Sequence, residues 1–213
     1  MKKLKFEIVG NLANIAFPDH LIKTRKELLA IILESCRFMM QNSTVEHADN
    51  LLMLVVNDMN RLFYCNDRKM YSVAFPFHTD STPTLKFDLE GIDISPAMIS
   101  NLISVINSNE FEMSSGYDFF TPIIDMEDNF SQDFWIVLKY LLTFELGYIR
   151  YDDDLAGFKK ASKDGHPKRH PRHHFDINYS GKIVYKIGLE KRLTPDIFVD
   201  ILDDSKDRKI LKL

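Results

Sequence analysis

Apolar residues recur with the period of an α-helix in several long stretches of the chain, separated by segments rich in Asn, Ser, Gly and Pro. The predicted helices are 18–41, 45–63, 95–107, 132–146 and a last helix that starts at Thr194-Pro195. Hydroxyl side chains suited to capping a helix stand at three of these starts: Ser95, Ser131 and Thr194. Shorter apolar or alternating runs predict strands at 5–9, 13–17, 70–77, 84–89 and 117–124.

After Gly147 the pattern changes to a period of two, which is typical of strands with one buried face. This part predicts strands at 148–152, 172–179 and 183–189, the last two forming a hairpin around Ser180-Gly181. Residues 153–171 between them are basic and form the longest connection for which no regular structure is predicted.

These elements predict a single compact α+β domain over 1–213, with four or five helices on a mixed, mainly antiparallel sheet. Within it, 1–147 is expected to be the helix-rich part. Residues 148–213 are expected to supply a small sheet, the basic loop and the terminal helix.

Composition supports a folded protein that works in a reducing compartment. The chain has 213 residues, is rich in Phe and Tyr, and contains two cysteines, too few for a disulfide framework or a cysteine-based zinc site. It shows no apolar run of membrane-spanning length and no signal-peptide pattern, so we expect a cytoplasmic protein without membrane contact. The motifs of P-loop, Rossmann, serine hydrolase and HExxH metalloprotease enzymes are also missing from the sequence, which argues against those classes.

Charge is distributed unevenly along the chain. Residues 1–150 carry 13 Lys and Arg against 20 Asp and Glu, whereas 151–213 carry 14 against 11. The basic residues concentrate in 159–172, together with His166, His170, His173 and His174. A local basic patch on an acidic body can steer a phosphate-bearing ligand, so Lys168, Arg169 and Arg172 are candidates for phosphate or nucleic-acid contact. The alternative is an ordinary solvated loop.

Strand alternation predicts which side chains of the C-terminal sheet share a face. Phe175, Ile177 and the neighbouring His173 are expected on the core side. The opposite face, expected to meet solvent, would carry Arg150, Asp152, Arg172, His174, Asp176, Asn178 and Lys186.

Several chemistries fit this predicted polar face. His174 and Asp176 could bind a divalent metal ion, with a third ligand from His170, His166 or Asp152. His174 could instead act as a general base without a metal, held by a carboxylate of Asp176 or Asp152, while Lys and Arg side chains stabilise a phosphorane-like charge. Lys186 and Arg150 could simply hold phosphates together with the basic loop. The fourth reading is a set of ordinary cross-strand polar pairs.

The stretches RYDDD at 150–154, HPRHHFD at 170–176 and TPDIF at 194–198 carry a resemblance. The C-terminal third resembles small uncharacterised bacterial proteins in which an Arg-aromatic-Asp stretch precedes a His-Pro-x-x-His strand and an Arg before a Pro-x-x-Phe helix. The matching positions are His170-Pro171, His173, Arg192, Pro195 and Phe198. The resemblance implies a bacterial intracellular setting among the cargo of mobile or phage-defence loci, and it implies no activity.

Three hypotheses of different classes follow. The leading one is a bacterial cytoplasmic accessory protein that contacts nucleic acid or a protein partner through the loop 159–174. The second is a hydrolase, most simply a nuclease, built on His174, Asp176 and Asp152. The third is a structural subunit of a larger complex, and the sequence leaves homo-oligomerisation open.

Overall fold

A computed structural model describes residues 2–56, 59–80, 84–108, 130–177, 185–207 and 210. The chain forms two compact units: Met1–Lys23, Thr44–Phe75 and Leu146–Leu213 make the first, and Thr24–Ser43 and Pro76–Glu145 make the second. The expected strand 117–124, the turn at Ser180-Gly181 and the position of Asn178 lie outside the described residues.

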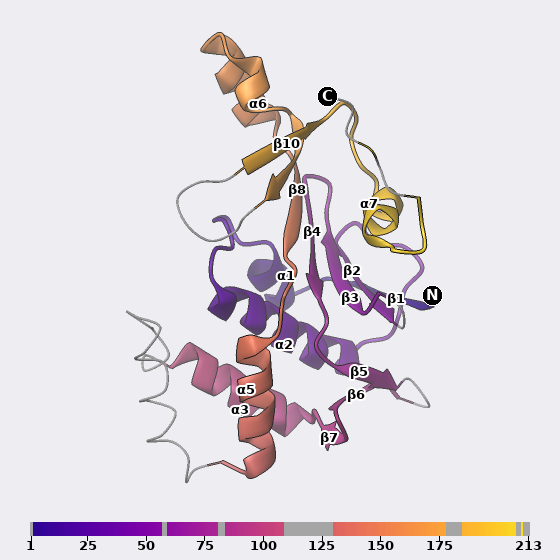
Figure 1. The fold of residues 1–213 in the computed structure, drawn as a ribbon. Helices are drawn as coiled ribbons and strands as arrows, with labels where there is room; N and C mark the ends of the chain where they lie inside the picture. The colour runs from indigo at the N-terminus through magenta and orange to yellow at the C-terminus, as the bar shows by residue number, and fades with distance from the viewer. Residues whose placement is uncertain are drawn as a thin grey trace. The chain divides into compact units, whose positions relative to one another are not determined.

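A seven-stranded sheet forms the first unit, and every described pair of neighbouring strands in it is antiparallel (Figure 1). The order across the sheet is β1 (Lys2–Glu7), β2 (Leu51–Val56), β3 (Arg61–Cys65), β4 (Lys69–Ala74), β8 (Ile149–Asp153), β9 (His173–Ile177) and β10 (Tyr185–Leu189). The first unit also contains α1 (Asn11–Ala16), α6 (Leu155–Lys163), the 3-10 turn η3 (Pro167–Arg169) and α7 (Pro195–Leu202).

One face of this sheet is apolar and is covered by α7. Phe198 of α7 is fully buried, and its ring packs edge-on against Phe63 of β3 at 5.7 Å and stacks with Phe175 of β9 at 6.0 Å. Tyr151 of β8 belongs to the same buried cluster. Because successive side chains of a strand alternate between faces, the neighbours of Phe175 and Tyr151 lie on the other side of the sheet.

The second unit consists of helices and a small sheet. Its helices are α2 (Arg25–Gln41), α3 (Pro96–Asn107) and α5 (Gln132–Thr143), and its three-stranded antiparallel sheet has the order β5 (His78–Asp80), β6 (Lys86–Leu89) and β7 (Ile92–Asp93). Arg25 donates to the carbonyl of Phe144 at 2.8 Å and thereby caps the end of α5. None of the helices that the structure describes combines the length and hydrophobicity that a membrane crossing requires.

The predicted α+β class with a mainly antiparallel sheet is confirmed, with six α-helices in the described residues. The helix predicted over 45–63 is wrong, because this segment forms β2 and β3. The run Leu51–Val56 is buried at every position, which is the pattern of a strand covered on both faces. Such a run does not alternate between apolar and polar residues, so its sequence does not indicate a strand. The stretch 1–147, expected to be rich in helices, therefore also supplies β1 to β7.

Local capping chemistry explains two further corrections. The helix expected from Pro18 begins only at Arg25, because Thr24 and Glu27 form a capping box in which the Thr24 hydroxyl accepts from the Glu27 backbone N–H at 3.2 Å. The segment 13–17, expected to be a strand, lies mostly in α1, and the hydroxyl of Tyr71 donates to the Ala16 carbonyl at 2.7 Å. The expected irregular connection 153–171 contains α6 and η3.

Removing the Phe198 ring should show how far the first unit depends on the docking of α7. Phe198→Ala is expected to lower the free energy of unfolding by about 3–5 kcal/mol, because a cavity would replace a fully buried ring. Urea denaturation measures the loss. Its neighbour Ile197 is 41% exposed, and Ile197→Ala should cost about 0.5 kcal/mol or less. Equal losses for the two variants would contradict this account of the core.

Candidate functional site

The registers of β8, β9 and β10 bring five predicted polar residues together on one face of the sheet. Arg150 is paired across strands with Asp176, and Asp152 with His174. Lys186 of β10 also lies opposite Asp176. All five lie on the face opposite Tyr151 and Phe175, as strand alternation predicted.

Arg150 is the centre of this group. Its guanidinium is bound to a carboxylate oxygen of Asp176 and lies 3.0 Å from an oxygen of Asp152. Arg150 is only 5% exposed and Asp176 only 7%. The expectation that this face meets solvent is therefore wrong, and the polar side chains form a largely buried network. Alternation gives the direction of a side chain but not what covers it.

The hydrogen bonds of His174 determine which ring nitrogen carries the proton. Nδ1 lies 2.7 Å from the carbonyl oxygen of Pro171, which can only accept, so Nδ1 is the donor. The remaining nitrogen, Nε2, presents a lone pair and accepts from the ammonium group of Lys186 at 2.7 Å. The same ammonium donates to Oδ1 of Asp176 at 2.7 Å. His174 thus acts as a base here only if Lys186 moves.

Burial and charge shift the titration of these groups in different directions. Burial raises the pKa of Asp152, although the neighbouring charge of Arg150 offsets part of this effect. Burial alone would also raise the pKa of Asp176, but the Lys186 hydrogen bond and the Arg150 charge outweigh it and lower that pKa. Burial, followed by the charge of Lys186, lowers the pKa of His174, so its imidazole is neutral at pH 7.

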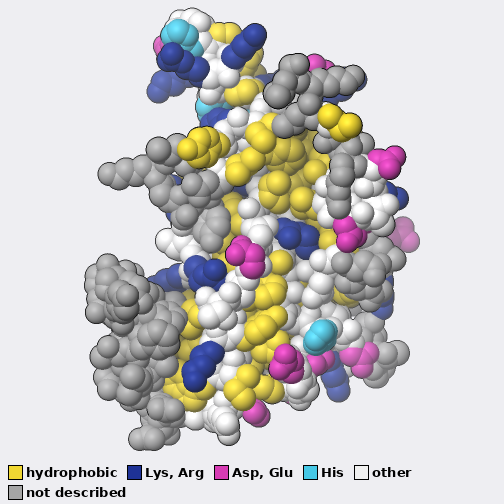
Figure 2. Space-filling view, in the orientation of Figure 1, with side chains coloured by type: hydrophobic (Ala, Val, Ile, Leu, Met, Phe, Trp, Pro, Cys, Tyr) yellow, Lys and Arg dark blue, Asp and Glu magenta, His cyan; other side chains and the backbone are white. Residues whose placement is uncertain are grey.

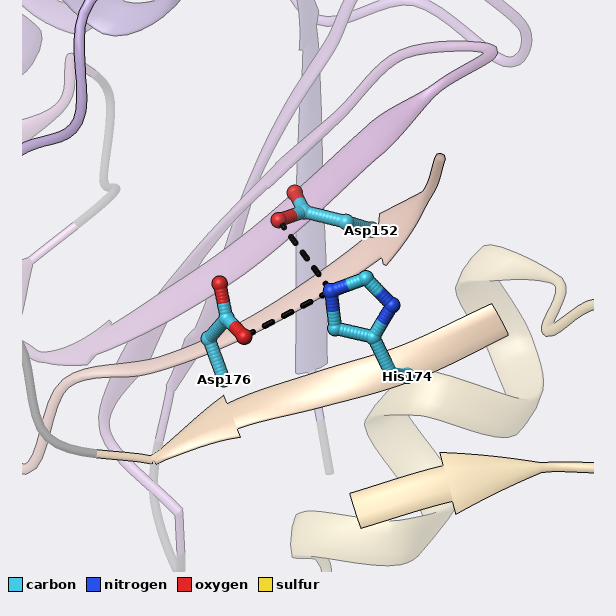
Figure 3. A group of neighbouring side chains, drawn as sticks. All are labelled: Asp152, His174 and Asp176. Carbon is cyan, nitrogen blue, oxygen red and sulfur yellow. Dashed lines mark ion pairs between the residues drawn. The ribbon is translucent and has the colours of Figure 1, made fainter. Parts of the chain in front are cut away.

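Figure 3 shows how three of these side chains converge. The carboxylates of Asp152 and Asp176 point toward Nε2 of His174, which lies 3.9 Å and 3.4 Å from their nearest oxygens. Among the described residues, these three form the group of potential metal ligands whose donor atoms all lie within 4.8 Å of one another.

His170, predicted as a metal ligand, does not join this group. Its Nε2 donates to Oδ2 of Asp154 at 2.7 Å, while Oδ1 of Asp154 accepts from the backbone N–H of Gly157 at 2.8 Å. The carboxylate of Asp154 therefore connects the first turn of α6 to His170, which follows η3. A Cβ atom on Gly157 would overlap with the side chains of both Asp154 and His170, so this close approach requires a glycine.

The predicted phosphate-binding residues divide into two groups. Lys186 and Arg150 belong to the network, where their charges are matched by Asp152 and Asp176. Lys168 and Arg169 are exposed on η3. Arg172 is half-exposed and makes a 2.7 Å ion pair with Asp153. The structure does not bring the loop residues and the network into one site.

Comparisons of the chain with protein families, with curated proteins and with solved structures returned no match. The geometry of the site and its charges therefore carry the functional argument.

One residue at the rim of the network was missed by the sequence analysis. Lys69 of β4 lies opposite Asp152 in the register, and burial lowers its pKa while Asp152 partly restores it. Both residues line an open polar pocket of about 270 Å³. The pocket is lined by Phe17, Pro18, Asp19, Asn66, Arg68, Lys69, Asp152, Asp153 and Asp154. Only the β4–β8 pairing, which joins residues about 80 positions apart, reveals this neighbour.

Arg150→Met should destabilise the first unit by about 3–5 kcal/mol, because it leaves two carboxylates buried with too little positive charge. Urea denaturation measures the change. Arg172→Met is the matched control: it breaks an ion pair whose arginine is 46% exposed, and it should cost about 1 kcal/mol or less. Adding Asp176→Asn to Arg150→Met should recover part of the loss. A double variant less stable than Arg150→Met would refute the electrostatic explanation.

Proposed function

We propose that this protein binds nucleic acid through the basic face formed by Lys159, Lys160, Lys163, Lys168 and Arg169 on α6 and η3. The observation that carries the proposal is that all five cations are exposed and that none has an acidic ion-pair partner among the described residues. Unmatched cations are available to phosphates, and they release counterions when phosphates bind.

The helix and the turn present these charges together. Lys163 follows Lys159 by four residues and Lys160 by three in α6, so its side chain neighbours both of them on the surface of the helix. η3 lies in contact with α6. Between them the backbone N–H of His166 donates to the Ala161 carbonyl at 2.8 Å and closes the C-terminal end of α6. Figure 2 shows Lys and Arg side chains gathered over α6 at the top of the view.

Hydrogen bonds hold the segment that carries the basic face in one conformation, which favours recognition of a regular array of phosphates. Asp154 holds both ends of the α6–η3 segment through Gly157 and His170. The backbone N–H of Asp154 also donates to the Arg172 carbonyl at 2.8 Å. A segment ordered before binding loses less conformational entropy when it meets its ligand.

The resemblance of the C-terminal third suggests the setting of this activity. We propose that the protein acts in the bacterial cytoplasm as an accessory component of a mobile or phage-defence locus. Two buried free thiols, Cys36 and Cys65, are compatible with a reducing compartment. The hydrolase hypothesis has less support, because the only lone pair of His174 accepts from Lys186 and His174 is fully buried.

Binding of a labelled DNA duplex and of a labelled single strand should be measured by fluorescence anisotropy over a series of salt concentrations. The triple variant Lys160→Ala, Lys163→Ala and Lys168→Ala should weaken binding about tenfold or more at low salt. It should also reduce the slope of log K against log salt by about 2–3, since each phosphate contact contributes about 0.7–0.9.

A triple variant with the same change in net charge serves as the control: Lys2→Ala, Lys86→Ala and Lys206→Ala, all at exposed positions that belong to neither α6 nor η3. It should bind nearly as well as the unaltered protein. Equal weakening by both triple variants would show that only net charge matters. Absence of binding to either nucleic acid would overturn the proposal and favour a protein partner for this surface.

A further inference from the structure

We propose that Asp152, His174 and Asp176 form a binding site for a divalent first-row metal ion, and that the ammonium group of Lys186 takes the place of this ion in the structure. The inference concerns the buried network and does not rest on nucleic-acid binding by α6 and η3.

The orientation of His174 is that of a metal ligand. Its Nδ1–H donates to the Pro171 carbonyl, a bond that fixes both the tautomer and the ring plane. Metal-binding imidazoles are held in the same way by a backbone carbonyl or a carboxylate on the nitrogen away from the metal. The lone pair of Nε2 consequently points into the space between the two carboxylates (Figure 3).

The atoms that meet in this space would repel one another without a cation. Nε2 of His174 lies 3.4 Å from Oδ1 of Asp176 and 3.9 Å from Oδ2 of Asp152. All three atoms carry lone pairs, and the neutral imidazole offers no proton on that side. The Lys186 ammonium satisfies two of them at 2.7 Å each. The position therefore already selects a cation.

The separations also suit a metal ion. Ligand atoms at about 2.1 Å from a tetrahedral ion lie about 3.4 Å apart, the distance between Nε2 and Oδ1 of Asp176. The wider 3.9 Å separation from Asp152 is within the small adjustment that its partly exposed side chain permits. Arg150 binds the second oxygen of Asp176, Oδ2, and on Asp152 it binds Oδ2, the oxygen that faces Nε2 of His174. A carboxylate oxygen has two lone pairs, so Oδ2 of Asp152 can accept from Arg150 and still bind the ion, and Arg150 would orient both carboxylates.

Lys186 can leave this position. It extends from β10, which in the described part of the sheet pairs with β9 alone, and its side chain is 22% exposed. The ammonium group can move to water because it is carried on a long, flexible stem. A set of one imidazole and two carboxylates, with further positions open to water, suits ions such as Mn²⁺ and Zn²⁺.

Mn²⁺ titration of the whole chain, followed by the electron paramagnetic resonance signal of the free ion, tests the site. Lys186→Met removes the competing ammonium and keeps the aliphatic stem, so it should tighten Mn²⁺ binding about tenfold or more. Adding Asp152→Asn to this variant should reverse the gain. Zn²⁺ should compete with Mn²⁺ for the same site.

His166→Ala is the control for adventitious binding by surface histidines, because His166 is exposed and lies outside the group. It should leave Mn²⁺ binding unchanged. Mn²⁺ should raise the melting temperature of Lys186→Met more than that of the unaltered protein, as followed by circular dichroism.

If Lys186→Met does not fold, Lys186→Gln removes the charge and retains a hydrogen-bond donor, and it should give the same tightening. Mn²⁺ binding by a folded Lys186 variant that is no tighter than in the unaltered protein would overturn the proposal. Tighter binding that Asp152→Asn does not affect would overturn it as well.

Discussion

The C-terminal end of the large sheet depends on one guanidinium buried between two carboxylates. Arg150 contacts Asp152 on its own strand and Asp176 on the next, so it joins β8 to β9 on the face opposite the apolar core. Removing such charges from water is costly, and the cost is offset only when every partner is in place. Lys186 of β10 joins the same network through its hydrogen bonds to Asp176 and His174. The polar face thus joins three strands, as Tyr151, Phe175 and Ile187 do on the other face.

The sequence contained most of the information needed to assemble this network. A period of two after Gly147 correctly placed Arg150, Asp152, His174, Asp176 and Lys186 on one face, because that rule depends only on backbone geometry. It could not show that the face is buried, since burial depends on elements distant in the chain. Lys69 was missed for the same reason: its position beside Asp152 follows from strand pairing over a long sequence separation.

Other errors have local causes. Six consecutive buried residues in Leu51–Val56 have neither a helical nor a strand period, so the surrounding apolar residues suggested a helix. The basic segment after Asp153 looked irregular because charged and glycine residues outnumber apolar ones. Its helix is held instead by Asp154, which caps α6 and accepts from His170. The sequence suggested His170 as a metal ligand, but its side chain binds Asp154 instead. The histidine whose Nε2 faces two carboxylates is His174.

The buried charges of Arg150, Asp152 and Asp176 also affect how the first unit responds to heat. The hydration of charged groups becomes less favourable as temperature rises, so the cost of withdrawing them from water falls. Apolar burial between α7 and the sheet gains no comparable advantage at high temperature. The ion pairs on one face of the sheet therefore contribute a larger share of its stability as the temperature rises. Cooling favours neither face, because apolar burial also stabilises the fold less in the cold.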